Sequence, residues 1–150
     1  LRYANAGHPP AFLKTSQDVP HRLEPTAMML GAVSIDDFEC GEHRTEMNSG
    51  DLVILYTDGV IESRDRQGNL LGIDGLERMI TETETPQRWA NHLMRLSEMH
   101  QAGKNEDDIL IATITHGRGR GTESNFGSDT LAPVISATRL SPRGLRYAAR

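Results

Sequence analysis

The chain has 150 residues, a hydrophobic fraction of 37% and a formal net charge of -5. This length allows one ordinary domain with a real core. No apolar run approaches the roughly 20 residues that span a bilayer, so we expect no membrane segment. Cys40 is the only cysteine, which excludes an internal disulfide and favours a reducing, cytoplasmic setting.

The charge is unevenly divided. Residues 1–116 carry 10 Lys or Arg and 19 Asp or Glu, a net -9, whereas residues 117–150 carry 6 Arg and 2 acids, a net +4. An acidic globular part argues against nucleic acid as its partner and is compatible with metal binding. The chain opens on Leu1 in a strand-like pattern, without an initiator Met or a signal-peptide pattern. We therefore expect it to come from the interior of a larger protein.

Short strands are expected near the N-terminus. Residues 1–5 alternate apolar and polar side chains, and residues 11–14 form a second apolar run, so the two suggest a hairpin or meander. Residues 15–27 contain Ser, Gln, Asp and two Pro and are expected to be a loop. Residues 38–47 alternate again and predict a strand with Cys40 among its inward positions.

The second half alternates strand and helix signals. Residues 52–57 form a continuous apolar run, typical of a strand buried on both faces. A helix is expected to begin near Asp74, which can act as its N-cap. A second helix is expected from Pro86 to a stop at Gly103. Apolar residues at helical spacing give each helix a face for the core: Leu76, Met79 and Ile80 in the first, and Trp89, Leu93 and Leu96 in the second. Residues 109–115 predict the last strand.

The character of the chain changes after His116. A Gly-Arg-Gly-Arg-Gly stretch opens a segment rich in Gly, Ser, Thr, Pro and Arg. Such a composition has little periodicity, so residues 117–150 are expected to be a disordered tail that adds nothing to the core. One Gly-Arg repeat is weak support for RNA binding.

Two aspartates stand at the tips of apolar strand-like runs. Asp58 follows residues 52–57, and Asp107 precedes residues 109–115. A rigid strand end holds a carboxylate in fixed geometry for a hard cation, and Gly59 lets the chain turn sharply beside an ion. Alone, an Asp-Gly after a strand is usually a simple turn, and an acidic stretch before a strand is usually a solvated loop. The pair together favours a metal site.

Four motifs in order and at matching spacing resemble a known family. They are Tyr-Ala-Asn-Ala-Gly-His-Pro-Pro at 3–10, Ser-Gly-Asp-Leu-Val-Ile-Leu-Tyr-Thr-Asp-Gly-Val-Ile-Glu at 49–62, Leu-Gly at 71–72 and Asp-Asp-Ile at 107–109. This set is similar to the PPM-type metal-dependent serine/threonine phosphatases, in particular their bacterial SpoIIE-like branch. The resemblance covers residues 1–116.

The resemblance implies a fold and a cofactor. The fold would be α+β, part of a β-sandwich flanked by helices, and residues 1–116 would be the C-terminal portion of the phosphatase domain with its N-terminal half absent. The complete domain would hold two Mn²⁺ or Mg²⁺ ions, with Asp58 and Asp107 as ligands here. No side chain would act as nucleophile, because a metal-bound water attacks the phosphorus.

Four further residues are implied as supporting the site: Gly59, Asp108, Glu62 and His8. Glu62 either orients the Asp58 loop or is simply solvated. His8 is a motif residue whose simpler interpretation is a histidine hydrogen-bonded at a strand end. Leu110 stands where the family usually has Thr, which removes a hydroxyl near the site.

The implied function is hydrolysis of phosphoserine or phosphothreonine in a regulatory protein, such as an anti-sigma-factor antagonist. The family also needs a ligand aspartate upstream of the Ala-Gly-His motif, and this chain has no Asp before Asp18. The chain alone is therefore expected to be an incomplete enzyme, and exposed strand faces would favour self-association. The alternative is a non-catalytic module that binds another protein.

Overall fold

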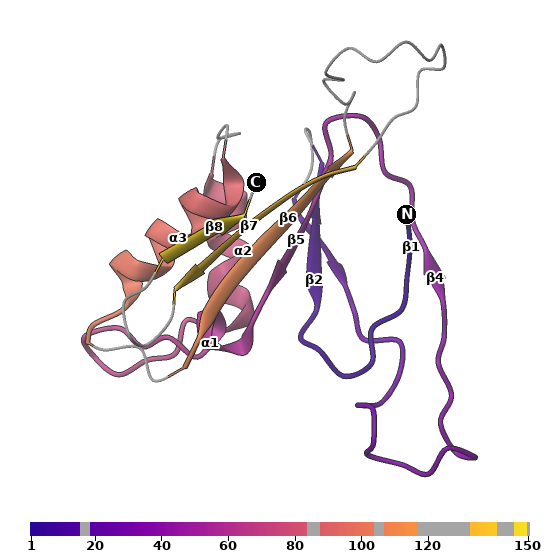
Figure 1. The fold of residues 1–150 in the computed structure, drawn as a ribbon. Coiled ribbons are helices and arrows are strands. Elements are labelled where there is room, and N and C mark those ends of the chain that lie inside the picture. Colours follow the sequence, from indigo (N-terminus) through magenta and orange to yellow (C-terminus); the bar gives the residue numbers. More distant parts are fainter. Residues whose placement is uncertain (16–18, 84–87, 104–106, 117–132, 141–145, 150) are drawn as a thin grey trace.

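The chain folds into two antiparallel sheets, with helices packed against one face of the larger sheet (Figure 1). The computed structural model describes residues 1–15, 19–83, 88–103, 107–116, 133–140 and 146–149. Its strands are β1 Arg2–Tyr3, β2 Ala11–Lys14, β3 His21–Leu23, β4 His43–Arg44, β5 Leu52–Tyr56, β6 Ile109–His116, β7 Pro133–Leu140 and β8 Arg146–Ala149. Its helices are α1 Asp58–Ile61, α2 Gly72–Glu82 and α3 Trp89–His100. Within the described ranges, no helix is long and apolar enough to cross a membrane.

The larger sheet has the strand order β3-β2-β5-β6-β7-β8, and its neighbouring strands run antiparallel. The apolar run of β5 suits its central position, where both faces are covered. Its register sets Ile54 opposite Phe12 of β2 and Thr113 of β6. Because side chains alternate along a strand, Ile54 and Val53 point to opposite faces of the sheet.

The main core lies between this sheet and helices α2 and α3. Phe12, Ile54 and Ile111 are fully buried on the sheet side. The helices contribute apolar residues at helical spacing, as the sequence predicts: Leu76, Ile80, Trp89 and Leu93. Burying each large apolar side chain stabilises the fold by about 1.5–3 kcal/mol, so this cluster holds the helices on the sheet.

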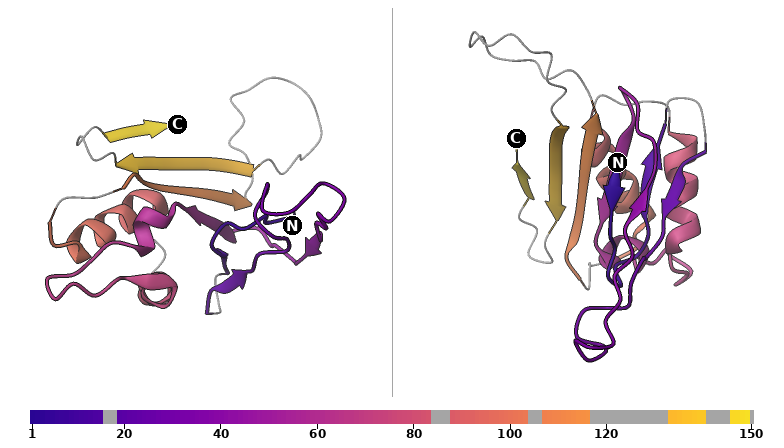
Figure 2. Two further views of the ribbon diagram at one scale, coloured as in Figure 1. Left: turned by 90° about the horizontal axis from the view of Figure 1, so that it is seen from below. Right: turned by 90° about the vertical axis from the view of Figure 1, so that its right-hand side faces the viewer.

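The opposite face of the sheet carries a smaller cluster. Ala11, Leu13, Leu23 and Val53 are buried there, and Tyr3 packs against them. Tyr3 belongs to the two-stranded sheet of β1 and β4, which lies on the side away from the helices (Figure 2). Two layers of strands with helices on one outer side confirm the predicted α+β fold with part of a sandwich.

Three parts of the chain meet at one end of the sheet. β5 runs into α1, and β6, its antiparallel neighbour, begins at that same end (Figure 1). The loop at residues 5–10, between β1 and β2, turns there as well. The expected site residues therefore come from segments far apart in sequence that the sheet brings to one edge.

The N-terminal strands differ from the prediction. β1 pairs with β4, and β2 pairs with β3 and β5, so the expected hairpin of the first two strands is wrong. β3 forms inside the stretch 15–27 that was expected to be loop. The strand expected over 38–47 contains only β4, and Cys40 is exposed. These strands are too short for periodicity to reveal, and their pairing depends on distant partners.

The helix boundaries also differ. α2 begins at Gly72, and Asp74 lies inside its first turn without capping it. Arg22 of β3 draws the Asp74 carboxylate into an ion pair, with Nη2 to Oδ1 at 2.6 Å, and also pairs with Glu77. This contact across 52 residues of sequence competes with the local cap. α3 begins at Trp89, and the predicted start at Pro86 lies outside the described residues.

The expectation of a disordered tail is wrong for two parts of residues 117–150. β7 pairs with the whole length of β6, from Ile109 opposite Leu140 to His116 opposite Pro133, and β8 pairs with β7. β6 otherwise presents a row of backbone N–H and C=O groups without partners on that side, which attracts another strand. The Gly-Arg stretch lies outside the described residues. A domain boundary at residue 116 stays a prediction.

Candidate metal centre

Thr57 fastens the end of β5 to the start of β6. Its backbone N–H donates to the Leu110 carbonyl at 3.0 Å. Its hydroxyl donates to the Asp108 carbonyl at 2.9 Å and accepts from the Leu110 N–H, also at 2.9 Å. One side chain thus satisfies a donor and an acceptor of the neighbouring strand just where the ladder ends. The loop that carries Asp58 is held against the segment that carries Asp107.

Gly59 allows this close approach. A Cβ at residue 59 would lie 2.7 Å from the Asp108 carbonyl oxygen and 3.2 Å from its carbon. The φ angle of Gly59 lies outside the left-handed region, so the need for glycine comes from space and not from backbone conformation. The supporting role expected for Gly59 therefore has a physical basis: only a hydrogen fits between the two segments.

The two predicted ligands are both exposed at this end of the sheet. Asp58 is the first residue of α1, and its Oδ1 accepts from the Gly59 N–H at 3.0 Å. Asp107 precedes β6, and its Oδ1 accepts from the Asp108 N–H at 2.6 Å. Each carboxylate is thus oriented by the backbone of the next residue. That both ligate one metal site stays a prediction.

Asp108 and Glu62 stabilise the segments around the two predicted ligands through their backbone groups. Asp108 is half-buried, and its carbonyl accepts the Thr57 hydroxyl. Glu62 is exposed, and its N–H donates to the Asp58 carbonyl at 2.9 Å, closing the single turn of α1. Within the described residues the Glu62 carboxylate has no hydrogen bond or ion pair, so any orienting effect on Asp58 comes from its backbone.

The loop of the Ala-Gly-His motif lies against the end of β5. The Asn5 side chain accepts from the His8 N–H at 2.9 Å and donates to the His8 carbonyl at 3.0 Å. The Tyr56 hydroxyl donates to the Pro10 carbonyl at 2.8 Å, and burial raises the pKa of Tyr56 to about 12. The ring of His8 meets that of Tyr56 edge-on, with centroids 6.1 Å apart.

The His8 ring is held by its own loop. Its Nδ1 lies 2.7 Å from the Pro9 carbonyl oxygen. A carbonyl only accepts, so Nδ1 carries the proton of this hydrogen bond. This agrees with the simpler interpretation, a histidine hydrogen-bonded at a strand end. It also places His8 on the side of the sheet end from which Asp58 emerges.

Comparison with known proteins shows which family the chain belongs to. The family model described as "Stage II sporulation protein E (SpoIIE)" matches residues 1–117. The chain belongs to the SpoIIE family. It is 32% identical over 81 residues to Protein IcfG of Synechocystis sp., covering 54% of this chain and 12% of that protein. It is 33% identical over 81 residues to the phosphoserine phosphatase RsbU of Bacillus subtilis, covering 53% of this chain and 23% of RsbU.

The fold agrees with a solved member of the SpoIIE family. The phosphatase domain of the cell fate determinant SpoIIE from Bacillus subtilis, in an Mn-presoaked form, superposes with a TM-score of 0.53. The match covers 83% of this chain and 58% of that one at 20% identity. A second structure of the same domain also gives 0.53. This chain therefore has the fold of part of a SpoIIE phosphatase domain.

Asp58 and Asp107 of this SpoIIE-family chain are the type of ligand that binds a divalent metal, but two carboxylates are too few for the complete site. Exposed carboxylate oxygens are the ligands that Mg²⁺ and Mn²⁺ prefer, and Asp58 and Asp107 supply them at one sheet end. No group of three or more His, Cys, Asp or Glu side chains is placed to hold a metal in the part of the chain that the structure describes.

Sequence reasoning missed Thr57 and Tyr56. Both close the apolar run of β5, which was interpreted only as a strand that delivers Asp58. A Thr at the end of such a run, directly before Asp-Gly, is a usable signal, because its hydroxyl reaches backbone groups of a neighbouring strand. Nothing in the sequence identifies Leu110 as the partner, because that depends on strand register.

Proposed function

We propose that this chain forms the part of a SpoIIE-family phosphoprotein phosphatase that contributes two metal-ligating aspartates, Asp58 and Asp107. The observation that carries the proposal is the contact between residues 57–59 and 108–110, which directly follow Asp107, fastened by the three hydrogen bonds of Thr57. It brings both acids to one end of the sheet. Exposed oxygens on two rigid, interlocked segments are suited to one hard cation.

The proposed reaction is hydrolysis of a phosphoserine or phosphothreonine ester. A bound Mn²⁺ or Mg²⁺ would polarise the phosphoryl group and acidify a water ligand. The protein would contribute position: Asp58 and Asp107 hold the ion, Gly59 lets their segments touch, and Asp108 anchors Thr57 through its carbonyl. His8 would line the site beside Tyr56 as a positioning residue rather than a metal ligand.

The substrate and setting follow from relatives and composition. RsbU is named a phosphoserine phosphatase, which supports a phosphorylated serine in a regulatory protein, for example an anti-sigma-factor antagonist. The acidic charge of residues 1–116 supports a protein partner over nucleic acid. We propose that the protein acts in the cytoplasm, as the lone Cys40 also favours.

The chain covers less than two thirds of each relative named above, so catalysis by this chain alone is expected to be weak. Two carboxylates do not suffice to bridge two ions about 4 Å apart. The half-buried Leu55 and Ile114 lie on the sheet face away from the helices, and this face supports self-association of the isolated chain. A non-catalytic binding module is the alternative if no metal binds.

Metal binding gives the first test. We expect Asp58→Asn and Asp107→Asn each to weaken Mn²⁺ binding by about tenfold or more, since each removes a charged oxygen ligand. Asp36→Asn, an exposed acid in another loop, should leave the affinity unchanged. Mn²⁺ titration followed by electron paramagnetic resonance measures all three. Equal weakening by Asp36→Asn would show that only general negative charge attracts the ion.

Hydrolysis gives the second test. A phosphoserine peptide is incubated with Mn²⁺ and either this chain or a natural protein that extends it upstream. We expect turnover by the longer protein that Asp58→Asn abolishes, and little by the chain alone. Turnover that survives Asp58→Asn would contradict the ligand assignment. Asp58 is exposed and Asn keeps an oxygen that accepts the Gly59 N–H, so we expect an unchanged thermal midpoint, and measuring it separates loss of activity from unfolding.

A further inference from the structure

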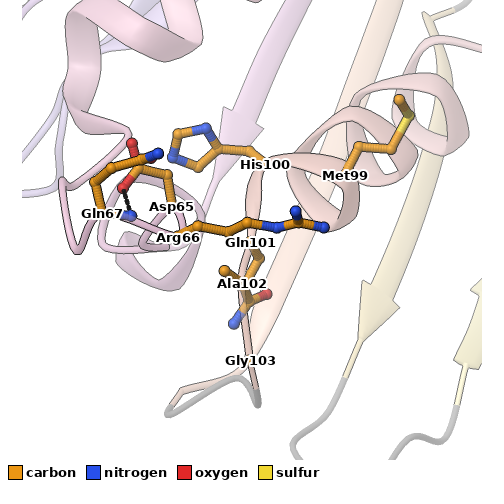
Figure 3. A pocket seen from close by; sticks show the side chains of 8 residues that line it. All are labelled: Asp65, Arg66, Gln67, Met99, His100, Gln101, Ala102 and Gly103. Carbon is orange, nitrogen blue, oxygen red and sulfur yellow. Dashed lines mark hydrogen bonds between the residues drawn. The ribbon is translucent and has the colours of Figure 1, made fainter.

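A pocket of about 670 Å³ lies between the loop after α1 and the end of α3 (Figure 3). Residues 65–67 line one side and residues 99–103 the other. The walls are tied together by a hydrogen bond from the Ala102 N–H to the Arg64 carbonyl at 2.9 Å. The pocket is therefore a feature of the packed fold and not a gap between unconnected loops.

The Asp65 carboxylate in this pocket is hydrogen-bonded within its own loop. Asp65 accepts hydrogen bonds from the backbone N–H groups of Gln67 at 2.8 Å and Asn69 at 2.9 Å, and from the Asn69 side chain at 3.1 Å. The hydrogen bonds from Asn69 lower the pKa of Asp65, so it stays ionised. Its role is to shape the turn, and little of its acceptor capacity is left for a ligand.

The groups left for a ligand are donors. Arg66 is exposed and makes no ion pair or hydrogen bond with another described residue. Figure 3 shows its side chain extending from the loop toward the last turn of α3, while His100 points back toward Asp65 and Gln67. The Nε2 atom of His100 is buried and has no hydrogen-bond partner in the described part. Arg66 is therefore the charged donor that this pocket offers to a ligand.

The pocket is also within reach of the metal centre. Gly103 is four residues from Asp107, a span of at most about 14 Å along the chain. An extended peptide covers this distance with about three to five residues. Both walls belong to the helix side of the larger sheet, away from the face that β1 and β4 occupy (Figure 2). A peptide bound at the metal centre can therefore continue into the pocket.

We propose that this pocket binds an acidic side chain of the phosphoprotein substrate, three to five residues from the phosphorylated residue, with Arg66 as its main contact. The inference rests on the proposed phosphatase function. The planar guanidinium of Arg66 matches a carboxylate in a two-bond arrangement. Asp65 and the C-terminal end of α3 bring negative charge to the same pocket, so a small free anion binds poorly. A peptide carboxylate alone binds only at millimolar concentration, and anchoring the rest of the peptide at the metal centre raises its effective concentration in the pocket.

Peptide kinetics test the preference. The substrates are phosphoserine peptides that carry Glu at one position from three to five residues on either side, each matched with a Gln peptide. For a natural protein that contains this chain with Mn²⁺, we expect one Glu peptide to exceed its Gln partner in kcat/KM by about three- to tenfold. Arg66→Gln should reduce that ratio to about one, while Arg95→Gln, an exposed arginine on α3, keeps it. Turnover of p-nitrophenyl phosphate should be equal in all three proteins.

A binding measurement separates this inference from the proposed function. The unphosphorylated Glu peptide is added at millimolar concentration to this chain, and amide shifts of residues 64–70 and 99–103 are followed by NMR. Shift changes that Arg66→Gln removes support the pocket even if no hydrolysis is found. A Glu preference that persists in Arg66→Gln, no preference at any position, or shift changes confined to other residues would each overturn the assignment.

Discussion

Replacing Gly59 with Ala tests the contact on which the metal centre depends. The added methyl would lie 2.7 Å from the Asp108 carbonyl oxygen, a backbone atom, in a buried position. Something must move, and the rigid neighbours are the starts of α1 and β6. We expect the two segments to separate, which lengthens the hydrogen bonds that Thr57 makes to Asp108 and Leu110.

The cost follows from these contacts. Forcing an extra methyl into a packed site costs about 1–3 kcal/mol, and each weakened hydrogen bond of Thr57 is worth about 1 kcal/mol at most. The better helix propensity of Ala offsets little, because α1 is a single turn of four residues. We expect Gly59→Ala to destabilise the chain by about 1–3 kcal/mol, which corresponds to about 3–9 °C in Tm for a protein of this size.

Gly75→Ala is the matched control. Its Cβ would also meet an atom at 2.7 Å, but that atom is the Cδ1 end of the Leu71 side chain, which can turn away. Gly75 lies inside α2, where Ala is favoured over Gly by about 1 kcal/mol. We expect this variant to be as stable as the natural chain within about 0.5 kcal/mol, because the two effects oppose each other.

Urea unfolding followed by tryptophan fluorescence measures both variants. Trp89 is the only tryptophan of the chain and is buried in the same cluster as Val60 of α1. Mn²⁺ affinity measured in parallel should fall for Gly59→Ala and stay unchanged for Gly75→Ala. Equal stability of Gly59→Ala and the natural chain would refute the close approach of residues 57–59 to residues 108–110.

Three further outcomes are expected. The pKa of Tyr56 is about 12 in the fold, against a reference value of 10.0. The folding stability that the protonated Tyr56 contributes is therefore intact below pH 10, and roughly 2–3 kcal/mol of it is lost between pH 10 and 12. Urea unfolding measured against pH should show this decline, and Tyr56→Phe should lack it. Arg22→Gln should lower the unfolding free energy by about 1 kcal/mol at low salt and less at high salt, since its partners Asp74 and Glu77 lose a half-exposed ion pair; equal effects at both salt concentrations would contradict an ionic role. Deleting residues 133–150 should lower Tm by several degrees, because β6 loses its pairing along its whole length; an unchanged midpoint in calorimetry would restore the view of this segment as a dispensable tail.

The sequence was informative wherever one element was long and uniform. β5 and β6 are continuous apolar runs, and the helical spacing of Trp89 and Leu93 predicted the buried face of α3. The same signals located Asp58 and Asp107 at strand ends before any pairing was known. These features depend on residues close in sequence, where side-chain period and apolar content act directly on the backbone.

The errors come from long-range contacts. β3 has three residues with two polar side chains, and it exists because it pairs with β2. Asp74 has the right identity for an N-cap, but the helix begins at Gly72 and Asp74 pairs with Arg22 of β3. Pro133–Leu140 was grouped with the Gly-Arg stretch before it, although Val, Ile and Thr within it favour strand. The pairing of β3 and the Arg22–Asp74 contact are not visible within a short window of sequence, whereas the strand propensity of Pro133–Leu140 is.

The candidate metal centre depends on strand register as much as on its acids. Tyr56 pairs with Ile111, so the next residue, Thr57, meets Leu110, and Gly59 passes beside Asp108. A slip of one residue would turn the Thr57 hydroxyl to the other face of the sheet and remove its bonds to β6. It would also set a different residue against Asp108, where only glycine fits. Thr57 and Gly59 therefore specify the register that brings Asp58 and Asp107 to one end of the sheet. Without this register the two carboxylates could not serve one metal site.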